Sequence, residues 1–132
     1  MPYWRLFYHI VWATKDREAL IKDGFATALH EQITKNAERL GATVHAVGGV
    51  ADHVHLAVSV PPSIALSEFI RQLKDSSSHF VNHELKPSVA FAWQSDYGVI
   101  SLDSKQLDKV AQYVTEQGNT TPSGLQSRCW SG

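Results

Sequence analysis

The sequence predicts a single α+β domain in which helices pack on a mainly antiparallel sheet. At 132 residues, the chain has the length of one compact domain. Its hydrophobic residues alternate in some segments and recur every three or four residues in others, as in strands and amphipathic helices respectively. These segments follow the order strand, helix, strand, strand, helix, strand, strand, helix, and adjacent strands in such an order favour antiparallel pairing.

The N-terminal half predicts a strand, a helix and a hairpin. Residues 3–14 are rich in aromatic and β-branched residues, which is typical of a strand. Residues 21–40 carry apolar side chains at helical spacing, and Gly41 marks the end of the expected helix. Residues 43–60 return to strand character, and the glycines and aspartate within residues 48–52 indicate the break of a hairpin.

The C-terminal half predicts a second helix, two short strands and a third helix. The second helix follows a Pro-Pro pair and covers residues 63–81. Short strands are expected at residues 90–93 and 97–102, on either side of a polar turn. Asp103 and Gln106 have the spacing of a capping box, so the third helix begins there.

Composition excludes several classes of protein. The longest apolar runs are far shorter than the roughly 20 residues of a membrane span, and the N-terminus has no secretory signal pattern. The net charge of −1 excludes a uniformly basic protein that coats nucleic acid. Cys129, the single cysteine, cannot form an internal disulfide, which favours an intracellular protein. We expect one domain over residues 1–118 and a loose polar tail over residues 119–132.

Seven histidines are the one unusual feature of the composition. His53 and His55 are two residues apart on a predicted strand, so their rings project from one face, about 6–7 Å apart at the backbone. Two imidazoles so placed can bind one divalent ion. The opposite face of this strand is entirely apolar, so we expect the pair to lie outside the core. Two solvated surface histidines remain the alternative.

Two further pairs share a helix face. Tyr113 and Gln117 are four residues apart on the third predicted helix. A tyrosine beside an apolar stripe is ordinarily a packing residue, but a metal ion nearby can stabilise its phenolate against a reference pKa of about 10 and make it a nucleophile. His79 and His83 have the same spacing and are an alternative zinc pair, although no glutamate lies between them as in zinc proteases.

Four basic residues are candidates for contacts with phosphate: Lys15, Arg17, Arg71 and Lys74. The first two follow the first predicted strand, and the other two lie one turn apart on the second predicted helix. Acidic residues flank the helical pair, so an ordinary solvated helix face explains it equally well.

Five motifs together resemble one protein family. They are YHIVWATK at residues 8–15, DHVHL at 52–56, LKDSS at 73–77, WQSDY at 93–97 and YVTEQ at 113–117. In order and spacing this series resembles the single-tyrosine HUH transposases of small bacterial insertion sequences, including REP-associated tyrosine transposases. Asp75 stands where the family often has glycine, so the resemblance bears on the chemistry more than on a particular DNA target.

The resemblance implies a ferredoxin- or RRM-like sandwich that cleaves and rejoins single-stranded DNA, usually at hairpin ends of a mobile element. By position, His53, His55 and Gln117 would bind Mg²⁺ or Mn²⁺, and Tyr113 would form a 5′-phosphotyrosine. The family also implies a homodimer in which the histidines of one subunit meet the tyrosine helix of the other. Such a protein would act in the cytoplasm of a bacterial or archaeal cell.

Two other functions remain open. An RRM-like module that binds single-stranded nucleic acid without cleaving it would use the aromatic residues of the first strand to stack on bases. A metal-dependent hydrolase would use His79 and His83 instead. A covalent adduct between the protein and hairpin DNA would separate the transposase from both.

Overall fold

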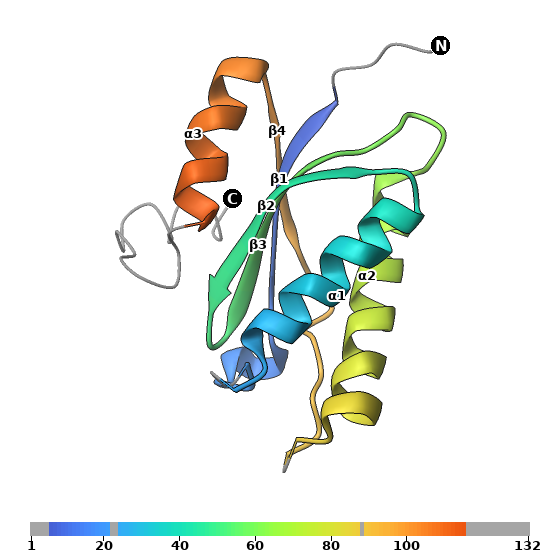
Figure 1. The fold of residues 1–132 in the computed structure, drawn as a ribbon, viewed down its shortest axis with the longest axis vertical. Coiled ribbons are helices and arrows are strands. Elements are labelled where there is room, and N and C mark those ends of the chain that lie inside the picture. Colours follow the sequence, from blue (N-terminus) through green and yellow to red (C-terminus); the bar gives the residue numbers. More distant parts are fainter. Residues whose placement is uncertain (1–5, 22–23, 88, 116–132) are drawn as a thin grey trace.

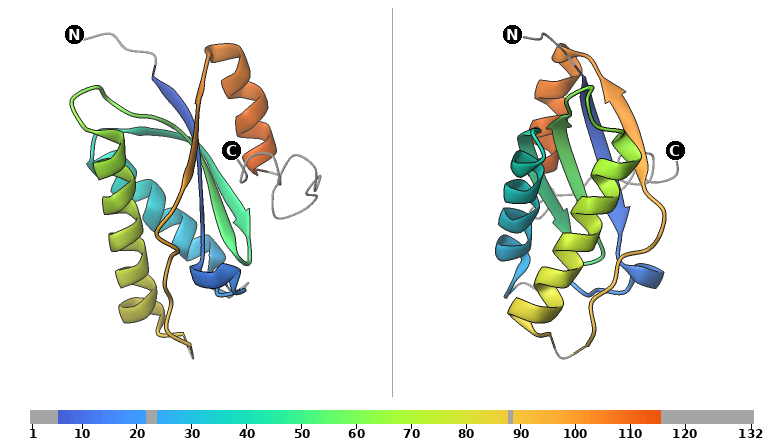
Figure 2. Two further views of the ribbon diagram at one scale, coloured as in Figure 1. Left: turned by 180° about the vertical axis from the view of Figure 1, so that it is seen from behind. Right: turned by 90° about the vertical axis from the view of Figure 1, so that its right-hand side faces the viewer.

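The computed structural model describes residues 6–21, 24–87 and 89–115. Four antiparallel strands form its middle layer, and helices lie on both sides of them (Figures 1 and 2). Within these ranges the strands are arranged in the order β2-β3-β1-β4. Their bounds are Phe7–Ala13 for β1, Thr43–Val50 for β2, His53–Ser59 for β3 and Gly98–Leu102 for β4. This is the ferredoxin-like sheet order, so the predicted α+β fold class is confirmed.

Helices cover both faces of the sheet. Figures 1 and 2 show α1 (Ala26–Arg39) and α2 (Leu66–Phe80) on one face of the sheet and α3 (Ser104–Thr115) on the other. None of the described helices is both long and apolar enough to cross a membrane.

The larger core lies between the sheet and the helices α1 and α2. Val54, Leu56 and Val58 of β3 face this core, as their alternation predicts. Leu29 and Ile33 of α1 meet them, and all five side chains are completely buried. Burial of each such side chain contributes about 1.5–3 kcal/mol to folding. The residues that form this layer are those that the alternation of the strand and the helical spacing of residues 21–40 predicted to face inward.

Helix α1 begins at Ala26, five residues later than predicted. The reason is a hydrogen bond from the backbone N–H of Ile21 to the carbonyl of Ala51, at 2.9 Å, which ties the preceding segment to the β2–β3 turn. The Ile21 side chain is nevertheless buried in the core. The predicted end of the helix is confirmed, because Gly41 has a φ of +94° and follows the last turn.

The hairpin turn lies at Ala51 and Asp52, within the predicted break at residues 48–52, although β2 continues through both glycines of that break. Gly48 serves a different purpose. A Cβ atom at this position would overlap the backbone carbonyl oxygen of Val114 in α3. The glycine therefore permits the close approach of a helix to the sheet rather than a turn.

The predicted strand at residues 90–93 does not form. Asn82 occupies both backbone groups of Phe91: its side-chain amide donates to the Phe91 carbonyl at 2.9 Å and accepts from the Phe91 N–H at 2.8 Å. A single bridge, between Thr14 and Trp93, joins this segment to the sheet. Because this pairing is antiparallel, residues 90–92 would have to pair with residues that follow Thr14. Strand β1 has already ended there, at Ala13, so the pairing extends no further.

The capping box that starts α3 is confirmed. The backbone N–H of Asp103 donates to Oε1 of Gln106 at 2.9 Å, and the N–H of Gln106 donates to Oδ1 of Asp103 at 2.7 Å. The helix is described as far as Thr115. The predicted domain boundary at residue 118 and the tail at 119–132 lie outside the described residues.

Candidate active site

Three buried histidines lie on the sheet face that α3 covers. His53 and His55 come from β3, and His9 comes from the neighbouring strand β1. Their exposed fractions are only 2%, 0% and 3% respectively. This corrects the prediction that the β3 pair lies outside the core. The alternation of one strand identifies its two faces, but it cannot show that a distant helix packs over the polar one.

Small residues of the sheet allow α3 to approach this face closely. Leu107 and Val114 of the helix are buried in a second, smaller apolar cluster. On the sheet side the cluster contains Ala46 of β2 and Ala57 of β3. Short side chains beneath the helix let it lie close to the strands that carry the histidines.

Tyr113 on α3 lies against the histidines. Its ring centre is 5.7 Å from that of His55, with the ring planes at 86°, and 6.4 Å from that of His9. The phenolic oxygen is buried. One chain therefore brings the predicted nucleophile to a predicted metal ligand, whereas the family resemblance led us to expect the tyrosine helix of another subunit at this place.

The third predicted ligand is not placed, because Gln117 lies outside the described residues. Across residues 6–21, 24–87 and 89–115, no three His, Cys, Asp or Glu side chains form a cluster that could hold a metal ion. The described part of the site offers the imidazoles of His53 and His55, whose ring centres are 4.9 Å apart. An ion there would need additional ligands.

The hydrogen bonds of the β3 pair fit a divalent cation. Nδ1 of His53 lies 2.6 Å from Oδ1 of Asp52, and donation to this carboxylate leaves the lone pair of the ring on Nε2. Nε2 of His55 is buried and has no hydrogen-bond partner among the described residues. Leaving a buried polar atom unsatisfied is costly, and a metal ion at this nitrogen would remove that cost.

Burial also keeps the imidazoles of His9 and His55 neutral. It lowers the pKa of His9 from 6.5 to about 4. For His55, burial is again the main cause, and the neighbouring His9 and His53 add to it, so that its pKa falls to about 3. With these pKa values both rings are neutral at pH 7. Neutral imidazole is the form that can bind a metal ion.

The lowered pKa values predict that acid destabilises the metal-free protein. Between pH 7 and pH 5 the unfolded chain takes up protons at His9 and His55, whose ordinary pKa is 6.5, whereas the folded chain does not. The free energy of unfolding should therefore decrease by about 2 kcal/mol per histidine over this range. Urea unfolding in EDTA at the two pH values measures the change, and the variant His9→Gln should lose roughly half of it. Equal stability at both pH values would contradict the prediction.

Lys15 and Arg17 lie in a 3₁₀ turn, η1 (Lys15–Arg17), which begins two residues after the end of β1. Nε of Arg17 is 3.6 Å from Oδ2 of Asp52, the carboxylate that also contacts His53. Arg17 has a φ of +57°, a conformation that is uncommon outside glycine and is concentrated at functional sites. Both basic side chains are exposed at this edge of the site, and their contact with DNA stays a prediction.

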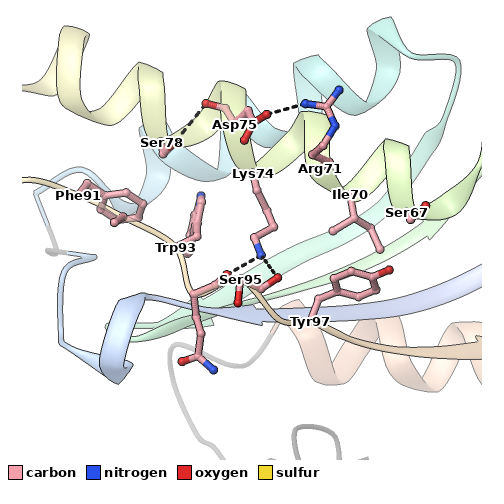
Figure 3. Close-up of a pocket in the computed structure, with 12 residues that line it drawn as sticks. Ser67, Ile70, Arg71, Lys74, Asp75, Ser78, Phe91, Trp93, Ser95 and Tyr97 are labelled. Carbon is pink, nitrogen blue, oxygen red and sulfur yellow. Dashed lines mark hydrogen bonds and ion pairs between the residues drawn. The ribbon is translucent and has the colours of Figure 1, made fainter.

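Arg71 and Lys74 lie on α2, on the opposite face of the sheet (Figures 2 and 3). They line a groove of about 430 Å³ between this helix and the segment before β4. Arg71 forms ion pairs with Glu68 at 2.5 Å and Asp75 at 2.8 Å. Nζ of Lys74 donates to the backbone carbonyls of residues 94–96. A phosphate would compete with these partners, so the predicted DNA contacts of this pair gain no support from the geometry.

His79 and His83 do not form a comparable site. Their rings stack with centres 4.0 Å apart at the end of α2 and in the π-helical turn η2 (Val81–Leu85). Both side chains are exposed, and the described residues supply no third ligand of the His, Cys, Asp or Glu type. The geometry therefore does not favour the alternative hydrolase.

Two residues of the site, Asp52 and His9, were not among the site residues predicted from the sequence. Asp52 directly precedes His53, so its position in the chain was a usable signal. His9 is two residues from both Phe7 and Val11 along β1, and this spacing predicts only that the three side chains share one face of the strand. Its proximity to His55 depends on the register between β1 and β3.

The chain is similar to transposases of small insertion sequences. The family described as "Transposase IS200 like" matches residues 2–117. The ISDra2 transposase TnpA of Deinococcus radiodurans is 26% identical over 119 residues, which cover 86% of this chain and 85% of the relative. The transposase for insertion sequence element IS200 of Salmonella typhimurium is 27% identical over 119 residues, covering 86% and 78% respectively.

Solved structures show the same architecture. A crystal structure from Deinococcus radiodurans, described as that of a transposase, has a TM-score of 0.68 and 26% identity, and the match covers 90% of this chain and 95% of the other. A REP-associated tyrosine transposase bound to a REP hairpin has a TM-score of 0.63 and 14% identity, with 86% and 67% covered. At 14% identity the second match supports the fold alone.

Proposed function

Because the chain belongs to the family of IS200-like transposases, and is therefore a DNA-processing enzyme, we propose that it cleaves and rejoins single-stranded DNA through Tyr113. The observation that carries this proposal is the position of Tyr113, with its phenolic oxygen buried and its ring 5.7 Å from that of His55. A phenylalanine would pack equally well beside an apolar stripe. A buried phenol between helix and imidazoles suits a nucleophile that must be held in place.

His53, His55 and Gln117 would hold Mg²⁺ or Mn²⁺. When bound, such an ion would polarise the scissile phosphate and stabilise the phenolate of Tyr113. Asp52 supports this assignment, because its 2.6 Å hydrogen bond fixes the ring of His53. Lys15 and Arg17, exposed at the same edge, would bind the flanking phosphates of the strand.

Tyr113 would attack the phosphorus in line with the bond to the 3′-oxygen. The bond between Oη and phosphorus forms as the bond between phosphorus and the 3′-oxygen breaks. The phenol loses a proton as the bond forms and the departing 3′-oxygen gains one, so the step neither takes up nor releases a proton overall. The products are a 5′-phosphotyrosine and a free 3′-hydroxyl. Because the phosphotyrosine is still a phosphodiester, attack by another 3′-hydroxyl rejoins strands without ATP.

The substrate would be a hairpin at the end of a mobile element, and the enzyme would be a homodimer. A structure that shares this fold contains a bound REP hairpin, so a hairpin is the substrate to test first. An edge strand supports the homodimer: in the described sheet, β4 pairs on one side only, and Val99 and Ile100 are 39% and 45% exposed. Whether the two active sites are shared between subunits stays a prediction.

A platform for the alternative, a binding module without cleavage, is not found in the described residues. Such a module stacks bases on aromatic residues of an open sheet face. Here α3 covers one face of the sheet, and α1 and α2 cover the other (Figure 2). Trp12 of β1, for example, is completely buried beneath the helix pair.

Two pairs of histidines offer a matched test. Wild-type protein, incubated with Mn²⁺ and single-stranded hairpins taken from the DNA that flanks its gene, should form a covalent adduct visible on a denaturing gel. The double variant His53→Ala/His55→Ala should lose Mn²⁺ binding and at least about 100-fold of the adduct yield. The control, His79→Ala/His83→Ala, should keep both, because this pair is exposed and remote from Tyr113. Loss of Mn²⁺ binding in the control alone would contradict the proposal.

A further inference from the structure

A hydrogen bond between two buried histidines is not explained by the roles assigned so far. Nε2 of His9 lies 2.9 Å from Nδ1 of His55, and the two residues are 46 positions apart in the sequence. The rings are stacked, with centres 5.1 Å apart and planes at 27°. The contact follows from the sheet register, in which His55 pairs with Val11, two residues along β1 from His9.

The direction of this hydrogen bond decides which nitrogen of His55 can bind a metal ion. A neutral imidazole carries one proton, so one ring nitrogen donates and the other accepts. If His9 donates, the proton of His55 is on Nε2, and this nitrogen cannot be a ligand. If His55 donates from Nδ1, its lone pair is on Nε2, the buried nitrogen without a partner among the described residues.

The neighbouring ligand shows the same pattern. His53 also engages Nδ1, in its case with the carboxylate of Asp52, and thereby keeps the lone pair on Nε2. Each of the two histidines of β3 thus has an acceptor available at Nδ1, one a carboxylate and the other an imidazole. In metal sites such partners fix the tautomer and the orientation of the ligand ring.

We propose that His9 is a positioning residue that accepts the Nδ1 proton of His55 and so directs Nε2 of His55 toward the metal ion. This inference rests on the proposed function, because it requires His55 to be a ligand. His9 itself would not bind the ion, because its Nε2 accepts the hydrogen bond and its Nδ1 then carries the ring proton. His9 therefore acts through His55 and not on the DNA.

Three variants test this role. His9→Phe keeps an aromatic ring beside Tyr113 but removes the acceptor. His9→Gln retains an acceptor in its side-chain carbonyl. His45→Phe is the matched control, because His45 is an exposed histidine of β2 whose ring bonds to Ser59 and is not among the contacts of the β3 pair. Circular dichroism and thermal unfolding establish that each variant is folded.

The first readout is the tautomer of His55 in metal-free protein, from long-range ¹H–¹⁵N spectra of the histidine rings at pH 7. We expect the Nδ1–H form in the wild type, and a shift toward the Nε2–H form in His9→Phe. The second readout is Mn²⁺ affinity, which should fall by about 10- to 100-fold in His9→Phe and stay within about threefold of wild type in His9→Gln and His45→Phe.

An Nε2–H tautomer in the wild type would overturn the inference, as would undiminished Mn²⁺ affinity in His9→Phe. A loss of Mn²⁺ affinity in His9→Gln as large as that in His9→Phe would also overturn it, because the retained acceptor would then make no difference. The two proposals can be distinguished. If wild-type protein binds no Mn²⁺, the metal site of the proposed function fails, and the tautomer measurement still tests the hydrogen bond.

Discussion

Replacing Tyr113 with phenylalanine should abolish the covalent adduct with hairpin DNA while leaving the protein folded. The substitution removes only the phenolic oxygen, the one atom of this side chain that can attack phosphorus. The ring would keep its edge contacts with His9 and His55. We expect adduct formation to fall by at least about 1,000-fold, as when other covalent nucleophiles are removed. Denaturing gels with a labelled hairpin and Mn²⁺ measure it.

The control for this experiment is Tyr8→Phe. Tyr8 lies on β1 and packs against the larger core, on the opposite side of the sheet from Tyr113. Its variant loses the same hydroxyl group and should form the adduct at the wild-type rate. Mn²⁺ affinity should be similar in all three proteins, because the tyrosine is not a ligand. An adduct that persists in Tyr113→Phe would show that another residue is the nucleophile.

Replacing Gly48 with alanine should displace α3 and impair the site without touching any residue of it. The added Cβ would overlap the backbone carbonyl of Val114, and backbone atoms cannot rotate away as a flexible side chain can. Overpacking of this kind costs about 1–3 kcal/mol in the free energy of unfolding. Because α3 carries Tyr113, we also expect adduct formation to fall by about 100-fold, the usual penalty for a misplaced reacting group.

The matched substitution is Gly24→Ala, at which an added Cβ would meet nothing within 4 Å. Its stability, from urea unfolding, should stay within about 0.5 kcal/mol of wild type, and its adduct yield should not change. Wild-type stability and adduct formation in Gly48→Ala would show that α3 does not pack on β2 as described.

Local patterns predicted most of the fold. The capping box of Asp103 and Gln106 forms as its spacing indicates, because both of its hydrogen bonds are made within one helical turn. The predicted strand at residues 90–93 failed for a non-local reason: Asn82 bonds the backbone of Phe91. Helix α1 starts late for a similar reason, since Ile21 is bonded to the β2–β3 turn.

The site was predicted less completely than the fold. Sequence motifs pointed to His53, His55 and Tyr113, and the structure places all three under or on α3. The burial of the histidines was not predicted, because it depends on a helix some 50 residues further along the chain. His9 was not predicted either, since nothing in β1 alone indicates which residue of β3 it will meet.

Periodicity, capping residues and ordered motifs, which are properties of short segments, were therefore enough to predict most elements, the fold class and the family. They could not predict that α3 covers the polar face of the sheet or that His9 meets His55 across two strands. The physical reason is that both contacts depend on strand register and helix packing, which bring together residues that are far apart in the chain.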